Sequence, residues 1–219
     1  MTYEQIKENE AVKTYIRQAD ASLGALGYTE HSFAHVGSVA EMTGYILQTM
    51  GKDARTVELG KIAGYLHDIG NLVNRVDHSR SGAIMAFRLL DRWGFPPEEI
   101  SLIVTAIGNH DEGTGAPINA VAAALILADK CDVRRSRVRP QECPPKGDIH
   151  DRVNYAVMES GLTLEPAEKM ATLRLTIDTE QCAVMDYFEI FLTRMMLCRR
   201  AAEYLSLRFR LIINGATML

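Results

Sequence analysis

Histidine and aspartate residues are concentrated in the first part of this chain. Five of the six histidines lie between residues 31 and 110, each near a predicted helix end or in a polar break. His67 and Asp68 are adjacent at the end of one predicted helix, and His110 closes another. Imidazole and carboxylate groups suit a first-row divalent cation such as manganese, iron, cobalt, nickel or zinc. The pattern therefore indicates a metal site built from side chains on several helices.

Asp129 adds a different kind of signal. It lies in the apolar segment AAALILADK, four residues after Leu125 on the same helical stripe. A buried, unpaired carboxylate there would be strongly unfavourable unless a cation lies beside it. A metal ion is the interpretation that also uses the histidines. A single histidine is more often a cap or a hydrogen-bonded core residue, and we assign His31 and His150 to that class.

The order of His35, then His67-Asp68, then Asp129 resembles the HD-domain superfamily of metal-dependent phosphohydrolases. The phrase GYLHDIGN closely matches that family's signature at the end of its third helix, and the resemblance covers roughly residues 30–139. It implies four shared metal ligands, His35, His67, Asp68 and Asp129. In binuclear members two further histidines follow the pair. His78 and His110 stand at the corresponding places, with Asp68 bridging the two ions.

The segment NHDEGTGAP is loosely similar to the HD-GYP cyclic-dinucleotide phosphodiesterases, but it departs from their pattern. The chain has His110-Asp111 where those enzymes have paired histidines, and Gly-Ala-Pro at 115–117 in place of Gly-Tyr-Pro. Asn71 stands where a lysine is common. These departures argue against a cyclic dinucleotide as the substrate.

The resemblance implies one or two divalent ions per chain, with magnesium added to the metals above, and hydrolysis by metal-activated water. Asp68 is the expected catalytic residue, because it can orient or deprotonate that water. Lys130 and Arg134 are expected to bind the substrate, since guanidinium and ammonium groups suit phosphate oxygens. We do not expect the substrate to contact Arg75, Arg80, Arg135, Arg137 or Arg139.

We therefore expect a phosphomonoesterase or phosphodiesterase acting on a nucleotide or related small molecule. The alternative is a metal-containing ligand-binding or regulatory module with little or no turnover. A third interpretation, nucleic-acid binding through residues 134–139, is the least favoured, because the net charge is −4 and the pI about 5.9.

Composition also bears on the location of the protein. The four cysteines form no CxxC pair, which argues against a disulfide scaffold and a thiolate zinc site. The polar N-terminus does not resemble a signal peptide, and the apolar run 120–128 is too short to span a bilayer. We expect a cytoplasmic protein without membrane or nucleic-acid partners, and a homodimer is one option for its assembly.

Apolar periodicity predicts the elements that must position these residues. It indicates helices over 3–26, 32–50, 54–67, 79–93, 97–110 and 117–135. Alternation predicts strands at 173–178 and 208–213, with a helix over 179–205 between them. The proline-rich segment 139–148 is expected to be a loop or boundary. The predicted fold is mainly α: an HD-type helical bundle (1–139) with a small α+β C-terminal appendage (140–219).

Aromatic residues and methionines between 185 and 196 have two interpretations. They are expected to be core residues, although Tyr187, Phe188, Ile190 and Phe191 could instead form a dimer surface.

Overall fold

The computed structural model describes residues 1–139 and 149–218, apart from the side chain of His150. The predicted loop or boundary over 139–148 therefore lies almost entirely outside the described residues, as does Cys143. The interpretation of His150 as a cap or core residue also stays a prediction.

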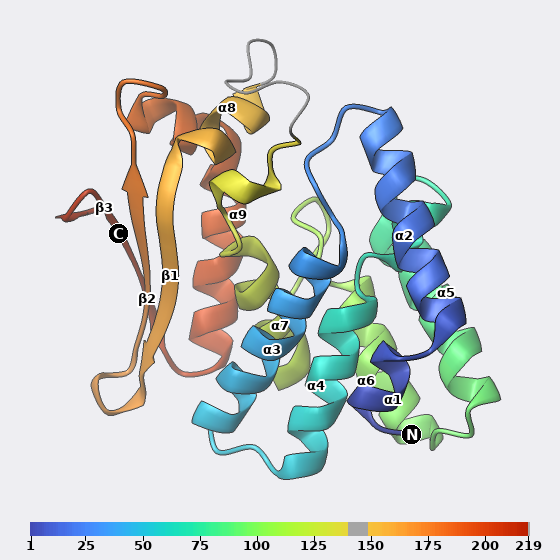
Figure 1. Ribbon diagram of the computed structural model, residues 1–219. Coiled ribbons are helices and arrows are strands. Elements are labelled where there is room, and N and C mark those ends of the chain that lie inside the picture. Colours follow the sequence, from blue (N-terminus) through green and yellow to red (C-terminus); the bar gives the residue numbers. More distant parts are fainter. Residues whose placement is uncertain (140–148, 219) are drawn as a thin grey trace.

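A helical bundle makes up the first part of the chain (Figure 1). Its helices are α1 (Tyr3–Lys7), α2 (Glu10–Ala25), α3 (Phe33–Thr49), α4 (Ala54–Leu66), α5 (His78–Arg92), α6 (Pro97–Gly108) and α7 (Ala120–Lys130), with short 3-10 turns η1 (Ile69–Leu72) and η2 (Arg135–Arg137). Helix α7 packs against α3, α4 and α6, and its residues are all buried beyond the first. The predicted ligands lie at or just beyond the ends of the helices α3 to α7.

Capping residues explain where the predicted helices begin and end. The side chains of Ser32, Asp53 and Asn119 accept hydrogen bonds from backbone N–H groups in the first turns of α3, α4 and α7. Gly27 and Gly51 follow α2 and α3 with φ of +81° and +70°, a conformation that favours glycine and ends a helix.

Several helix boundaries differ from the prediction. Residues 3–26 form two helices, because Asn9 caps α2 by accepting hydrogen bonds from the N–H groups of Ala11 and Val12. Helix α5 begins at His78, one residue before the predicted cap Ser79. Helix α7 covers only Ala120–Lys130 of the predicted 117–135.

The C-terminal part contains α8 (Ile149–Ala156), β1 (Val157–Glu165), η3 (Pro166–Glu168), β2 (Met170–Ile177), α9 (Val184–Tyr204), β3 (Arg208–Ile213) and β4 (Ala216–Thr217). The strand order is β1-β2-β3-β4, with β2 and β3 parallel and the other pairs antiparallel. Both predicted strands are present, and α9 is the crossover between them. Helix α8 and strands β1 and β4 were not predicted.

Helix α9 joins the two parts of the molecule. It lies between α7 and the sheet and packs against both α7 and β3 (Figure 1). Tyr187 and Phe191 are buried in the same hydrophobic cluster as α7, which confirms their interpretation as core residues. Met185 and Met196 are exposed, so the core interpretation is wrong for these two methionines. The fold is thus a helical bundle with a small α+β appendage, as predicted, and the division at residue 139 stays a prediction. Within the described residues, no helix combines the length and apolar character needed to cross a bilayer.

Candidate metal centre and adjoining pocket

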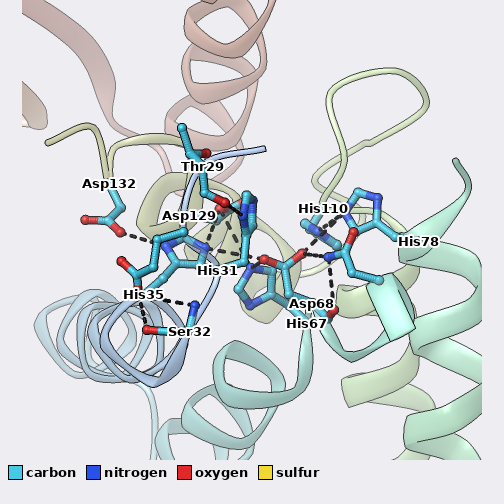
Figure 2. Close-up of polar contacts among 12 residues, drawn as sticks. Thr29, His31, Ser32, His35, His67, Asp68, His78, His110, Asp129 and Asp132 are labelled. Atoms are coloured by element: carbon cyan, nitrogen blue, oxygen red, sulfur yellow. Dashed lines mark hydrogen bonds and ion pairs between the residues drawn. The ribbon is translucent and has the colours of Figure 1, made fainter. Parts of the chain in front are cut away.

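Five helix ends bring the predicted ligands together (Figure 2). His35 lies in the first turn of α3, His67 directly follows α4, and His78 is the first residue of α5. His110 follows the end of α6, and Asp129 is the penultimate residue of α7. All six predicted ligands, including Asp68, are at most 7 % exposed. The sequence order of the ligands therefore becomes a single buried cluster.

Close backbone packing makes this convergence possible. A Cβ on Gly64 would lie 2.7 Å from Cα of Ala40, so a glycine here lets α4 approach α3 closely. A Cβ on Gly70 would lie 1.9 Å from the carbonyl oxygen of His78. Gly70 thus allows the turn after His67-Asp68 to pass directly against the start of α5.

One group of ligand atoms surrounds the space between α3, α4 and α7. Nε2 of His35 lies 3.5 Å from Oδ2 of Asp68 and 3.4 Å from Oδ1 of Asp129. Nε2 of His67 lies 3.2 Å and 3.7 Å from the same two oxygens. Two imidazoles and two carboxylates therefore point at one place, which suits a divalent cation.

A second group lies on the other side of Asp68. Oδ1 of Asp68, the oxygen turned away from His35, is 3.5 Å from Nε2 of His78. Nε2 of His78 is in turn 3.2 Å from Nε2 of His110. Ligand atoms of His67, Asp68 and His110 also lie within 4.8 Å of one another. The two oxygens of Asp68 thus face two different histidine groups, which is the geometry of a bridging carboxylate.

Each histidine is oriented through its other ring nitrogen. Nδ1 of His35 lies 2.7 Å from Asp132, and Nδ1 of His67 and of His110 lie 2.7 Å and 2.6 Å from the carbonyl oxygens of Gly64 and Ile107. An Nδ1 proton donated to such an acceptor leaves a lone pair on Nε2. Nε2 of His35 and of His67 are buried and have no hydrogen-bond partner among the residues that the structure describes. These unpaired nitrogens fit a metal ion, which they could coordinate.

Electrostatics at the centre also favour a cation. Burial and the charge of Arg137 lower the pKa of His35, but the nearby carboxylates of Asp129, Asp132 and Asp68 outweigh them and raise the pKa to about 9. Burial raises the pKa of Asp129, but Lys130 and the histidines hold it well below its usual value. Both aspartates of the centre are thus ionised, and the site holds a positive charge at His35 when no metal competes for it.

The two predicted substrate-binding residues make other contacts. Nζ of Lys130 lies 2.7 Å from Oδ2 of Asp129 and 2.6 Å from Oε2 of Glu112, and the residue is 4 % exposed. Arg134 donates its Nε to Asp132 across 2.8 Å. Lys130 therefore supplies a cationic partner for Asp129, so the burial of this carboxylate does not by itself require a metal. The unpaired Nε2 atoms are the stronger argument.

A pocket of 360 Å³ adjoins the centre. His31 lines it, with its ring centroid 5.5 Å from that of His35. Arg75 also lines it and places Nη1 3.3 Å from Nε2 of His78. Arg137 and Arg194 complete a set of three guanidinium groups around the pocket. The opening beside the centre is therefore lined by cations, as an anionic substrate requires.

Several of these residues were not singled out by the sequence. Asp132 follows Asp129 by three residues, and its proximity to the basic run was the available signal. Arg194 lies on α9 and carried no signal, because only the packing of α9 on α7 brings it to the pocket. His31 was assigned to the cap or core class, yet it lies at the edge of the pocket beside His35.

Comparison with known proteins agrees with this geometry. A protein-family model described as HD domain matches residues 32–134, the segment that carries all six predicted ligands. An uncharacterized protein of Methanocaldococcus jannaschii is 25 % identical, over 82 % of this chain and 77 % of that protein. A crystal structure described as a predicted HD superfamily hydrolase, from an uncultured Thermotogales bacterium, is 23 % identical with a TM-score of 0.46, covering 60 % of this chain and 73 % of that one. Residues 32–134 thus match the HD domain, the family that the order of the predicted ligands resembles.

Proposed function

We propose that this protein is a metal-dependent phosphohydrolase that cleaves a phosphate ester of a nucleotide or related small molecule. The observation that carries the proposal is the pair of buried Nε2 atoms, on His35 and His67, that face two ionised aspartates and lack any other partner. A cation-lined pocket beside them supports an anionic substrate.

The proposed ligands divide into two sets. His35, His67, Asp68 and Asp129 would hold one ion, and His78 and His110 would hold a second one across Asp68. A divalent ion held there would neutralise a phosphoryl oxygen and lower the pKa of a coordinated water. The identity of the metal is left to the experiment, because imidazole and carboxylate ligands suit manganese, iron, cobalt, nickel and zinc alike, and magnesium to a lesser extent.

The chain's own residues then perform the remaining steps. Asp68 is ionised, because its pKa is held well below the usual value by His67 and His35 despite its burial. It accepts a proton from the attacking water as the water oxygen bonds to phosphorus. The ester P–O bond breaks, and its electron pair leaves with the departing oxygen, which takes up a proton from solvent. Arg75, beside His78, donates hydrogen bonds to the phosphoryl oxygens.

Metal content and turnover, measured on the same preparations, test the proposal. Protein purified without chelator is assayed for metals, and hydrolysis of bis(p-nitrophenyl) phosphate and a nucleotide panel is followed with several divalent ions supplied. The variants are Asp68→Asn and Asp129→Asn, and Asp91→Asn on the exposed face of α5 is the matched control. Metal and hydrolysis lost together in the first two variants only is the expected result.

Two other outcomes have different meanings. Folded wild-type protein that takes up no metal would overturn the proposal. Bound metal without hydrolysis of any substrate would instead favour a ligand-binding or regulatory module.

A further inference from the structure

Two of the three guanidinium groups at the pocket lie away from the second histidine group. Arg75 approaches His78, where a scissile phosphoryl group would bind. Arg137 belongs to η2, and Arg194 to α9, on the other part of the chain. The pocket therefore has cationic side chains at more than one place. The proposed hydrolysis of a single phosphoryl group uses only Arg75.

Arg137 is buried without an ion pair. It is 4 % exposed, and it donates Nε to the carbonyl oxygen of Glu30 and Nη1 to that of Asp132, each across 3.1 Å. Among the described residues no carboxylate oxygen lies within 4.0 Å of its guanidinium group. A buried cation held only by neutral groups is costly unless an anion joins it. The pocket is where such an anion can reach it.

Arg194 contacts two neighbouring side chains, but these contacts do not occupy all the hydrogen-bond donors of its guanidinium group. Its Nε donates to Oε1 of Glu112 across 3.0 Å, and its guanidinium carbon lies 4.7 Å from the ring centroid of Phe191. Glu112 is also bound by Lys130, so this carboxylate is shared between two cations. Arg194 therefore contributes positive charge that Glu112 does not cancel alone.

Several nitrogens of these two arginines have no partner and are open to the pocket. They are Nη2 of Arg137 and both Nη atoms of Arg194, for which the described residues provide no acceptor. None of them is among the fully buried side-chain nitrogens that lack a hydrogen bond in the described part of the chain. Since both residues line the pocket, these donors are available to a ligand.

We propose that Arg137 and Arg194 form a subsite for a second phosphate group, so that the substrates are phosphate esters that carry two phosphates. This inference rests on the proposed function, because it assigns a substrate class to the same site. The two guanidinium groups come from different elements, and a tetrahedral phosphate offers oxygens in several directions, whereas a planar carboxylate matches one guanidinium fork. The carboxylates at the pocket, Glu112 and Asp151, number one fewer than the arginines, which leaves a positive excess.

Direct binding tests the subsite without turnover. Chelator-treated protein is titrated calorimetrically with inorganic phosphate and with inorganic pyrophosphate. We expect pyrophosphate to bind at least about tenfold more tightly, and Arg194→Ala to reduce that ratio to below about threefold. Arg194→Lys, which keeps the charge but not the fork, is expected to fall between them. Arg199→Ala, on an exposed part of the same helix, is the matched control and keeps the wild-type ratio.

A second, conservative variant distinguishes loss of the subsite from misfolding of the protein. Arg137→Lys keeps the charge near the carbonyl groups of Glu30 and Asp132, and its thermal unfolding is checked before titration. It is also expected to lower the pyrophosphate preference. Equal affinities for the two anions in the wild type, or an unchanged preference in both variants, would overturn the inference.

Turnover then separates this inference from the proposed function. Adenosine 5′-monophosphate and adenosine 3′,5′-bisphosphate are compared as substrates of the metal-loaded protein. A lower KM for the bisphosphate than for the monophosphate, together with loss of this difference in Arg194→Ala, supports both the second-phosphate subsite and the phosphohydrolase activity. Hydrolysis with the same KM for both substrates would overturn the second-phosphate subsite and leave the phosphohydrolase standing. Selective pyrophosphate binding without any hydrolysis would do the reverse, because the subsite would exist without the reaction.

Discussion

Nδ1 of His35 donates a hydrogen bond to Oδ2 of Asp132 across 2.7 Å, from the first turn of α3 to the residue that follows the C-cap of α7. This contact fixes the ring so that Nε2 points at Asp68 and Asp129. Asp132→Asn weakens the contact, and we expect the affinity for the metal to fall by about 10- to 100-fold. Titration against a competing chelator measures it. A wild-type affinity in this variant would show that Asp132 does not orient the ligand.

Arg134 is expected to act through the same carboxylate and not through the substrate. It donates its Nε to Oδ1 of Asp132 across 2.8 Å. Arg134→Ala should therefore lower the metal affinity, by less than Asp132→Asn does, while KM at saturating metal stays within about twofold of the wild type. A large rise in KM with normal metal affinity would instead restore Arg134 as a substrate-binding residue.

Lys130 is expected to stabilise the fold more than it contributes to substrate binding. Lys130→Met leaves the carboxylates of Asp129 and Glu112 without their buried cation, which costs about 3 kcal/mol of unfolding free energy in the metal-free protein. Urea denaturation measures this loss. Lys13→Met removes only surface ion pairs with Glu8 and Glu10 and should cost less than about 1 kcal/mol. Similar losses in the two variants would contradict the assignment.

Substitutions in the two histidine groups are expected to remove different ions. His78→Ala removes a predicted ligand on the Oδ1 side of Asp68, so we expect about one ion per chain to be lost from a protein that binds two. His35→Ala acts on the group that includes Asp129 and should empty that position instead. Metal analysis together with the paramagnetic spectrum of the manganese-loaded protein distinguishes the two. Identical spectra and metal contents would mean that the centre holds one ion.

Gly70 is the backbone position least tolerant of a side chain. A methyl group there would lie 1.9 Å from the carbonyl oxygen of His78 and 2.4 Å from the backbone nitrogen of Gly82. Gly70→Ala therefore forces η1 away from α5, and we expect a loss of about 3 kcal/mol or more of stability together with weaker metal binding. Gly37→Ala, in α3 with nothing within 4 Å, should gain about 0.5–1 kcal/mol. A stable Gly70→Ala protein would contradict the packing described.

The convergence of the predicted ligands was predictable because they occupy helix ends that the apolar periodicity marks. His67-Asp68 follows a clear apolar stripe, and Asp129 is conspicuous within AAALILADK. The break between α1 and α2 was missed, because Asn9 is a capping signal that the continuous pattern over 3–26 concealed. Strand β1 was missed for a related reason: Glu159, Ser160 and Gly161 are exposed and do not alternate in polarity with their neighbours.

Partners from distant parts of the chain were beyond prediction. The sequence shows that Asp129 is buried, but the choice between a metal ion and Lys130 as its partner depends on the orientation of two side chains. Arg194 is 82 residues from Glu112, and no local pattern connects them. The composition of the pocket therefore followed only from the packing of α9 against the bundle.

Helix α9 lines the pocket but carries none of the proposed metal ligands, so the residues that would select a substrate and those that would hold the metal lie partly on different elements. Its contribution to the pocket comes from Phe191 and Arg194, whereas all the proposed metal ligands belong to the helical bundle. Descendants of such a chain can acquire a new substrate preference by substitutions on one helix face while the chemistry of the centre is inherited unchanged. For protein engineering, the same arrangement offers residues on α9 as a place to randomise specificity without rebuilding the catalytic machinery.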